Sequence, residues 1–263
     1  MTIVLVTVIA VSWTCLLTGA GTGMRPHEMA AALPDYSGMA VMLMSPATWT
    51  TAYALLMFSM WWLMMIAMML PSAAPMVLAH AAITHRGLAQ ADSTGSGDAS
   101  RGVLPATSAF LAGYLVMWAV FSLFAVVAQW LLERSALLSS MMTSSSRMFG
   151  CVLLLAAGLW QFTPLKTACL KHCRSPAGFL AGHWQPGVGG AFRMGSLHGM
   201  FCLGCCWILM ALLFYGGVMN LVWIIGLAFF VLAEKLIPAG IVFGKVTGLL
   251  LIAWGAWVGF SVT

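Results

Sequence analysis

Long apolar runs without charge are the feature that most limits how this chain can fold. The run from Leu104 to Leu132 contains no Asp, Glu, Lys, Arg or His, and about 20 apolar residues are enough for a helix to cross a bilayer. Only 6% of the 263 residues are charged, compared with about 25% in an ordinary soluble domain. The alternating segments of a transmembrane β-barrel are absent, so helices are left to satisfy backbone groups in lipid. The sequence predicts an all-α fold, in which residues 1–263 form one polytopic transmembrane helical bundle.

Seven apolar segments are predicted to span the membrane. They cover residues 2–20, 50–85, 104–132, 148–162, 194–214, 218–233 and 238–260. Pro71 and Pro75 are expected to break or kink the second segment, because proline removes a helical hydrogen bond. Three loops are expected between the segments: a Met-rich loop over 21–49, a flexible Gly/Ser-rich loop over 87–102 and a Cys/His-bearing loop over 163–193.

The basic residues divide unevenly between the two sets of loops that seven spans create. One set holds Arg25, Arg134 and Arg147, and the other holds Arg86, Arg101, Lys166, Lys171, Arg174, Arg193 and Lys235. The positive-inside rule makes the second set cytoplasmic. The prediction is a multi-pass protein of the cell's inner (plasma) membrane with its N-terminus in the cytoplasm.

A few charged residues are expected inside the membrane region. Glu234 and Lys235 lie at the end of the sixth segment, and Lys245 lies within the seventh. Charge is costly in lipid, so we expect Lys245 to snorkel, to pair with Glu234 or to line a polar cavity.

One apolar stretch, MGSLHGMFCLGCCWILM at residues 194–210, carries four potential metal ligands. His198, Cys202, Cys205 and Cys206 stand at i, i+4, i+7 and i+8, so on a helix they point to one side. The first three share an arc of roughly 60° at 3.6 residues per turn, and Cys206 lies at its edge. This pattern predicts a site for a soft metal or a redox thiol pair.

Other soft ligands accompany this stretch. Cys169 and Cys173, at i and i+4, would face the same way on a short helix. Met64 and Met68 belong to a methionine stripe in the second segment, which is explained by packing or by a metal path. The Met-rich loop is likewise either an interfacial segment or a weak copper-gathering surface.

Four pieces of the chain carry a resemblance to a known family. They are MMIAMMLPSAAP at 64–75, QFTPLKTACLKHCRSP at 161–176, GSLHGMFCLGCCWILM at 195–210 and VLAEK at 231–235. Together they resemble a bacterial family of predicted metal-binding integral membrane proteins of unknown function, the domain of unknown function 2182. The resemblance implies a metal site made from Cys169, Cys173, His198, Cys202, Cys205 and Cys206, without implying an activity.

Three interpretations of the site remain open from the sequence. The first is copper handling, either Cu(I) transport or delivery to a soluble or membrane metalloprotein partner, because Cys and Met ligands select Cu(I). The second is a membrane oxidoreductase, or a membrane subunit of one, with a Cys-based redox or metal centre. The third is close packing by small residues. Copper is the expected metal, with zinc or iron as alternatives.

Nucleic acid is not an expected partner. The net charge of +5 is loop charge of the kind that orients a membrane protein. The expected partners are the lipid bilayer and a metalloprotein, and a homo-oligomer remains possible.

Overall fold

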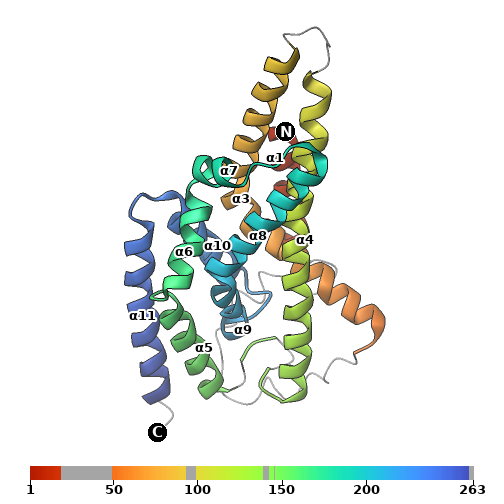
Figure 1. Ribbon diagram of the computed structural model, residues 1–263. Helices are drawn as coiled ribbons and strands as arrows, with labels where there is room; N and C mark the ends of the chain where they lie inside the picture. Colours follow the sequence, from red (N-terminus) through yellow and green to blue (C-terminus); the bar gives the residue numbers. More distant parts are fainter. Residues whose placement is uncertain (19–48, 93–98, 139–141, 145, 261–263) are drawn as a thin grey trace.

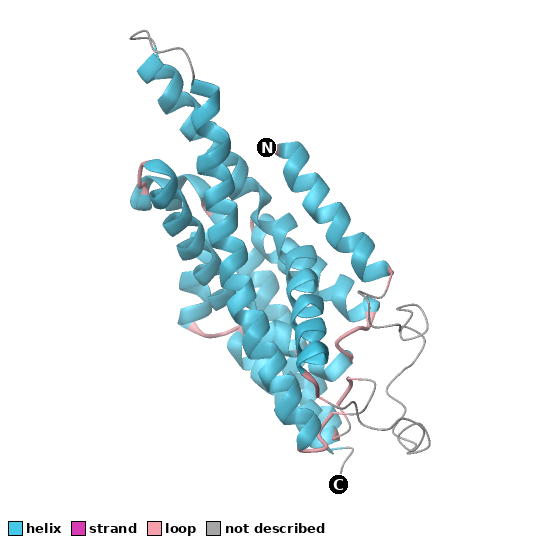
Figure 2. Ribbon diagram, turned by 90° about the vertical axis from the view of Figure 1, so that its right-hand side faces the viewer, coloured by secondary structure: helices cyan, strands magenta, loops and turns pink. Residues whose placement is uncertain are grey.

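The computed structural model describes residues 1–18, 49–92, 99–138, 142–144 and 146–260. Within these ranges the regular structure is α-helical, apart from one isolated antiparallel bridge between Leu138 and Ser144 (Figures 1 and 2). The helices are α1 (Thr2–Leu17), α3 (Thr51–Asp92), α4 (Ala99–Arg134), α5 (Arg147–Trp160), α6 (Pro164–Arg174), α7 (Pro176–His183), α8 (Gly187–Ala211), α9 (Leu213–Gly216), α10 (Leu221–Leu236) and α11 (Gly240–Phe260). The predicted all-α bundle is therefore confirmed.

Four of the described helical segments are long and apolar enough to cross a membrane. They are Thr51–Leu88, Gly102–Arg134, Gly187–Gly216 and Gly240–Phe260, and the pair α5–α6, bent by 64°, would make a fifth. The sequence predicted seven spans. The other two predicted spans, α1 and α10, have 16 residues each, fewer than the roughly 20 that a bilayer requires.

Several predicted loops and breaks are helical in the structure. Pro71 and Pro75 lie inside α3, which continues to Asp92. Close to the prolines, Ser72 Oγ and Tyr114 Oη both donate to the Met69 carbonyl, at 2.8 and 3.3 Å.

The expected loop boundaries also change. The Gly/Ser-rich stretch 87–102 is helical at both ends, in α3 and α4, and most of the stretch 163–193 forms α6, α7 and the start of α8. The predicted Met-rich loop 21–49 lies outside the described residues except for Trp49.

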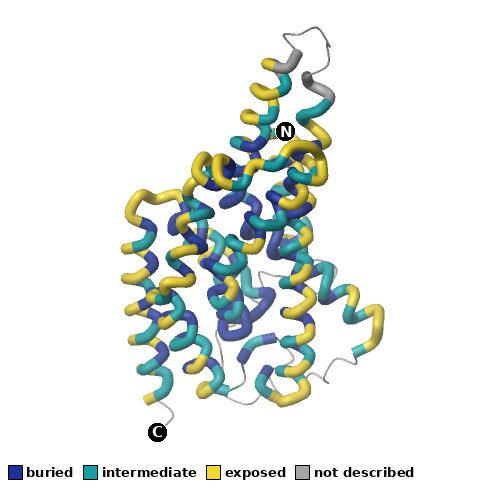
Figure 3. Tube along the Cα trace, viewed as in Figure 1, coloured by how far each residue is buried: buried dark blue, intermediate teal, exposed yellow. Residues whose placement is uncertain are grey.

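The core lies where α8 packs along α4, the most extensive helix contact among the described residues. Glycines allow the two backbones to approach closely: a Cβ on Gly195 would collide with the Phe110 carbonyl, and one on Gly113 would collide with the Phe192 carbonyl. Figure 3 shows the buried segments gathered in the middle of the bundle, with the outer faces of α4 and α11 exposed. This close contact fixes the face that α8 turns inward.

We expect Gly195→Ala to destabilise the protein, because the added methyl group meets backbone rather than a movable side chain. Overpacking of this kind costs about 1–3 kcal/mol. Thermal unfolding of the protein in detergent should show a lower Tm. The matched control is Gly189→Ala on the same helix, where a Cβ meets nothing within 4 Å. Equal Tm values for the two variants would contradict this account of the α4–α8 contact.

Candidate functional site

The stripe of α8 that the sequence singled out faces the interior of the bundle. Cys202, Cys205 and Cys206 are each 0% exposed, and His198 is 2% exposed. All seven cysteines of the chain are free thiols. The side chains that could bind a metal are therefore buried inside the protein, and none of the cysteines is tied up in a disulfide.

Cys202 is the centre of the polar contacts in this region. Lys235 Nζ, from α10, donates to Cys202 Sγ at 3.0 Å and to Ser72 Oγ, on α3, at 2.9 Å. Tyr114 Oη, from α4, lies 3.2 Å from the same sulfur. Four helices thus meet around one sulfur atom, and the ammonium beside it stabilises negative charge there.

The next two cysteines lie one turn further along α8. The thiols of Cys205 and Cys206 donate to the Cys202 carbonyl, at 3.0 and 2.9 Å. Cys206 Sγ also lies 3.9 Å from Met69 Sδ on α3. A thiol and a thioether from two helices are therefore in contact inside the core.

The cysteines of α6 border the same region. Cys173 is buried on α6 in the neighbourhood of Cys202 and Cys205. Cys169 packs against α8 at Gly204, where a Cβ would overlap its sulfur. The i, i+4 spacing of these cysteines brings both of them to the α8 side of α6, where they are buried.

His198 is surrounded mainly by aromatic rings. Its ring centroid lies 5.7 Å from Tyr114, 5.4 Å from Phe179 and 6.2 Å from Phe110. Its Nδ1 atom is buried without a hydrogen-bond partner among the described residues. A buried imidazole nitrogen left unsatisfied is costly for stability, and it retains the capacity to bind a ligand.

The predicted ligands do not form one ready-made centre. In the part of the chain that the structure describes, no three His, Cys, Asp or Glu side chains are arranged to hold a metal ion. The physical reason lies in the contacts above: the Cys205 and Cys206 thiols turn to a backbone carbonyl, and His198 lies among aromatic rings. Metal binding by these residues stays a prediction.

The methionine stripe of α3 is buried in the core. Met64 is 0% exposed and Met68 is 1% exposed, but the α3 sulfur in contact with a cysteine belongs to Met69. From the sequence, Met64 and Met68 were selected as candidate ligands and Met69 was not. Only the packing of α3 against its neighbours decides which methionine reaches α8.

A second buried polar group involves Glu234. It pairs with Lys166 of α6, with Nζ and Oε1 2.5 Å apart, and both side chains are 2% exposed. Lys166 also donates to Gln161 Oε1, and Gly244 leaves room beside the Glu234 carboxylate, which a Cβ would overlap. The suggested Lys245–Glu234 pair is therefore wrong; Lys245 is exposed.

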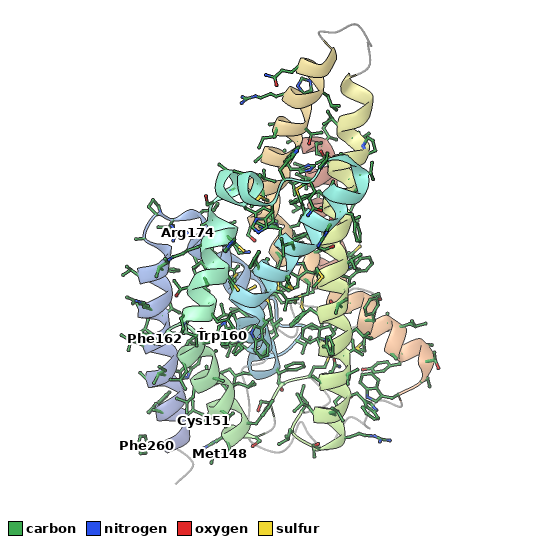
Figure 4. All side chains as sticks on the ribbon, in the orientation of Figure 1. Met148, Cys151, Trp160, Phe162, Arg174 and Phe260 are labelled. Atoms are coloured by element: carbon green, nitrogen blue, oxygen red, sulfur yellow. The ribbon has the colours of Figure 1, made fainter. Side chains whose placement is uncertain are left out.

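Arg174 secures the same end of the bundle. Its Nη2 donates to the carbonyls of Ile237 and Pro238, at 2.6 and 2.7 Å. Figure 4 shows it at the end of α6, beside the connection into α11. The sequence could not identify the partners of Lys166 and Arg174, because it assigned both residues to a loop.

We expect Glu234→Leu to destabilise the protein by about 3–5 kcal/mol, because it leaves the Lys166 ammonium buried without its carboxylate. The double variant Lys166→Met/Glu234→Leu should recover most of the loss, since neither charge is then stranded. Chemical or thermal unfolding in detergent measures both. Lys245→Met is the control and should leave the stability unchanged. If the double variant is no more stable than Glu234→Leu, the buried pair is not the cause.

The fold and the site together define a class of protein: an all-α bundle in which four or five of the described helical segments are apolar enough to span a membrane. In its core a cysteine sulfur lies beside a buried lysine, and a neighbouring cysteine contacts a methionine sulfur. The chain belongs to the PpoB2 family of copper chaperones, whose family model matches residues 58–258. The match includes α4–α10 and most of α3 and α11, so the copper-related part of the prediction is supported. Comparisons with curated proteins and with solved structures gave no match.

Proposed function

We propose that this protein is a membrane copper chaperone that holds Cu(I) on the buried sulfurs of α8 and α3 and passes it to an acceptor metalloprotein. The observation that carries the proposal is the contact between Cys206 Sγ and Met69 Sδ, 3.9 Å apart and one helical turn from Cys202. Thiolate and thioether ligands together select Cu(I) among physiological metals. Membership of a copper chaperone family supports the same metal.

The charge around Cys202 supports a monovalent ion. Two thiolates binding Cu(I) carry a net charge of −1, which is costly inside a bundle. The Lys235 ammonium, 3.0 Å from Cys202 Sγ, balances that charge. With Cys202 and Cys206 as thiolates and Met69 as a neutral ligand, the site with Lys235 is neutral overall.

Zinc is less well supported by the same residues. A structural zinc site uses four Cys and His ligands in a tetrahedron, and the described residues contain no arrangement of even three such groups. The thioether of Met69, in contact with Cys206, is a ligand that suits copper. The geometry therefore favours copper over zinc.

Elemental analysis of the purified protein tests the proposal. We expect protein loaded with Cu(I) in detergent to retain near-stoichiometric copper, and Cys202→Ser/Cys206→Ser to lose it, because serine oxygen is a poor ligand for a soft ion. Cys151→Ser is the matched control, since Cys151 is a buried cysteine on α5 (Figure 4). Zinc in place of copper, or full copper retention in the double variant, would refute the proposed site.

The alternative function, a membrane oxidoreductase, requires that the same thiols be accessible to a substrate. A thiol that exchanges with a substrate must be reachable, and the three cysteines of α8 are 0% exposed. Burial supports metal holding over thiol exchange.

Alkylation of the folded protein separates the two functions. We expect a water-soluble maleimide to modify Cys15, which is partly exposed, and to leave Cys202, Cys205 and Cys206 unmodified until the protein is unfolded. Peptide mass spectrometry identifies the modified residues. Rapid modification of Cys202 or Cys206 in the folded protein would instead favour the oxidoreductase.

A further inference from the structure

A second group of soft ligands lines a cavity at the N-terminal part of α8. The cavity has a volume of about 360 Å³ and lies among α4, α7 and α8. Three methionines and a histidine contribute to its wall: Met117, His183, Met194 and Met200. They come from three helices, so the fold rather than a local motif brings them together.

His183 has one ring nitrogen whose lone pair is available to a metal. Its Nδ1 atom lies 3.0 Å from the Phe179 carbonyl oxygen, which only accepts hydrogen bonds, so the neutral ring carries its proton on Nδ1. Nε2 therefore retains its lone pair. A histidine that binds metal commonly donates its other nitrogen to a backbone carbonyl in this way.

The methionines differ in depth, which gives the cavity an outer and an inner end. Met200 is 52% exposed, whereas Met194 is 1% exposed. Met194 Sδ accepts a hydrogen bond from the backbone N–H of Gln185 at 3.4 Å. This bond positions the sulfur at the cavity. Soft ligands thus extend from the surface to the buried side of α8.

The inner end joins the stripe described above. Met194, His198, Cys202 and Cys206 follow one another at intervals of four residues on the buried side of α8, so successive side chains lie about 6 Å apart along the axis. Phe179 contacts both His183 and His198, with ring centroids 4.9 and 5.4 Å apart. The cavity therefore lies at the outer end of a row of potential copper ligands spaced about one turn apart along α8.

We propose that this cavity is a second Cu(I) site, a loading site that receives copper and passes it along α8 to the buried cysteines. The transfer of copper to the buried cysteines rests on the proposed function. The binding of copper in the cavity does not. Arg193 also lines the cavity, and its positive charge weakens cation binding. The loading site therefore holds copper less tightly than the thiols do, as a site that releases its ion must.

Competition with a Cu(I)-selective chelator tests the second site on the full-length protein in detergent, under reducing conditions. We expect the wild type to bind a tight and a weaker equivalent of Cu(I). The triple variant Met117→Leu/Met194→Leu/Met200→Leu, which conserves volume, should lose the weaker equivalent and keep the tight one. His183→Gln should weaken the same equivalent by roughly tenfold or more. Met148→Leu, an exposed methionine at the far end of α5 (Figure 4), is the control and should keep both.

The cysteine variant separates failure of this inference from failure of the proposed function. Cys202→Ser/Cys206→Ser should keep the weaker equivalent and lose the tight one. A wild type with one equivalent, or a triple variant that keeps both, would overturn the loading site. If the cysteine variant keeps the tight equivalent while the triple variant loses the weaker one, the loading site stands and the buried copper site is wrong. A melting curve for each variant confirms that it is folded.

Discussion

The contact between the Lys235 ammonium and the Cys202 sulfur is the interaction on which the interior of this bundle depends. A lysine that is 5% exposed inside an apolar fold is tolerated only when its charge meets polar partners. Its two acceptors, Ser72 Oγ and Cys202 Sγ, belong to α3 and α8, so α10 can occupy only a position that reaches both. The same requirement places a positive charge beside the sulfurs. Burying the Lys235 ammonium costs folding free energy. The same positive charge makes the core suitable for an anionic copper–thiolate centre.

The close packing of α8 on α4 gives this centre a dry environment. Gly113 and Gly195 let the backbones touch, and the rings of Phe110, Tyr114 and Phe179 enclose His198 beside the cysteines. Thiols sealed in this way are shielded from oxidants and from exchange with other thiols. A chaperone needs that shielding, because Cu(I) must travel without reacting. It also needs an opening, and the methionine-lined cavity at the N-terminal part of α8 provides soft ligands at the surface.

The sequence predicted the features that lie within single segments. It could not predict the contacts between helices. The spacing of His198, Cys202 and Cys206 placed them on one side of a helix, and the scarcity of charge predicted an all-α membrane bundle; both follow from periodicity and composition within one segment. The contacts of Tyr114, Met69 and Lys166 depend on how different helices align, which no single segment encodes. Tyr114 lies in a long apolar run, where nothing in the local sequence marks it as a site residue. Lys166 was assigned to a loop because α6 is short and polar. Two of the seven predicted spans, α1 and α10, are as apolar as the longer helices but have only 16 residues each in the structure.

The proposed function requires that buried sulfur atoms bind the copper. X-ray absorption at the copper edge of the protein loaded with one equivalent of Cu(I) measures the oxidation state and the ligand atoms directly. We expect Cu(I) with a shell dominated by sulfur, as Cys202, Cys206 and Met69 would supply. Copper(II), or a shell of nitrogen and oxygen atoms alone, would contradict it.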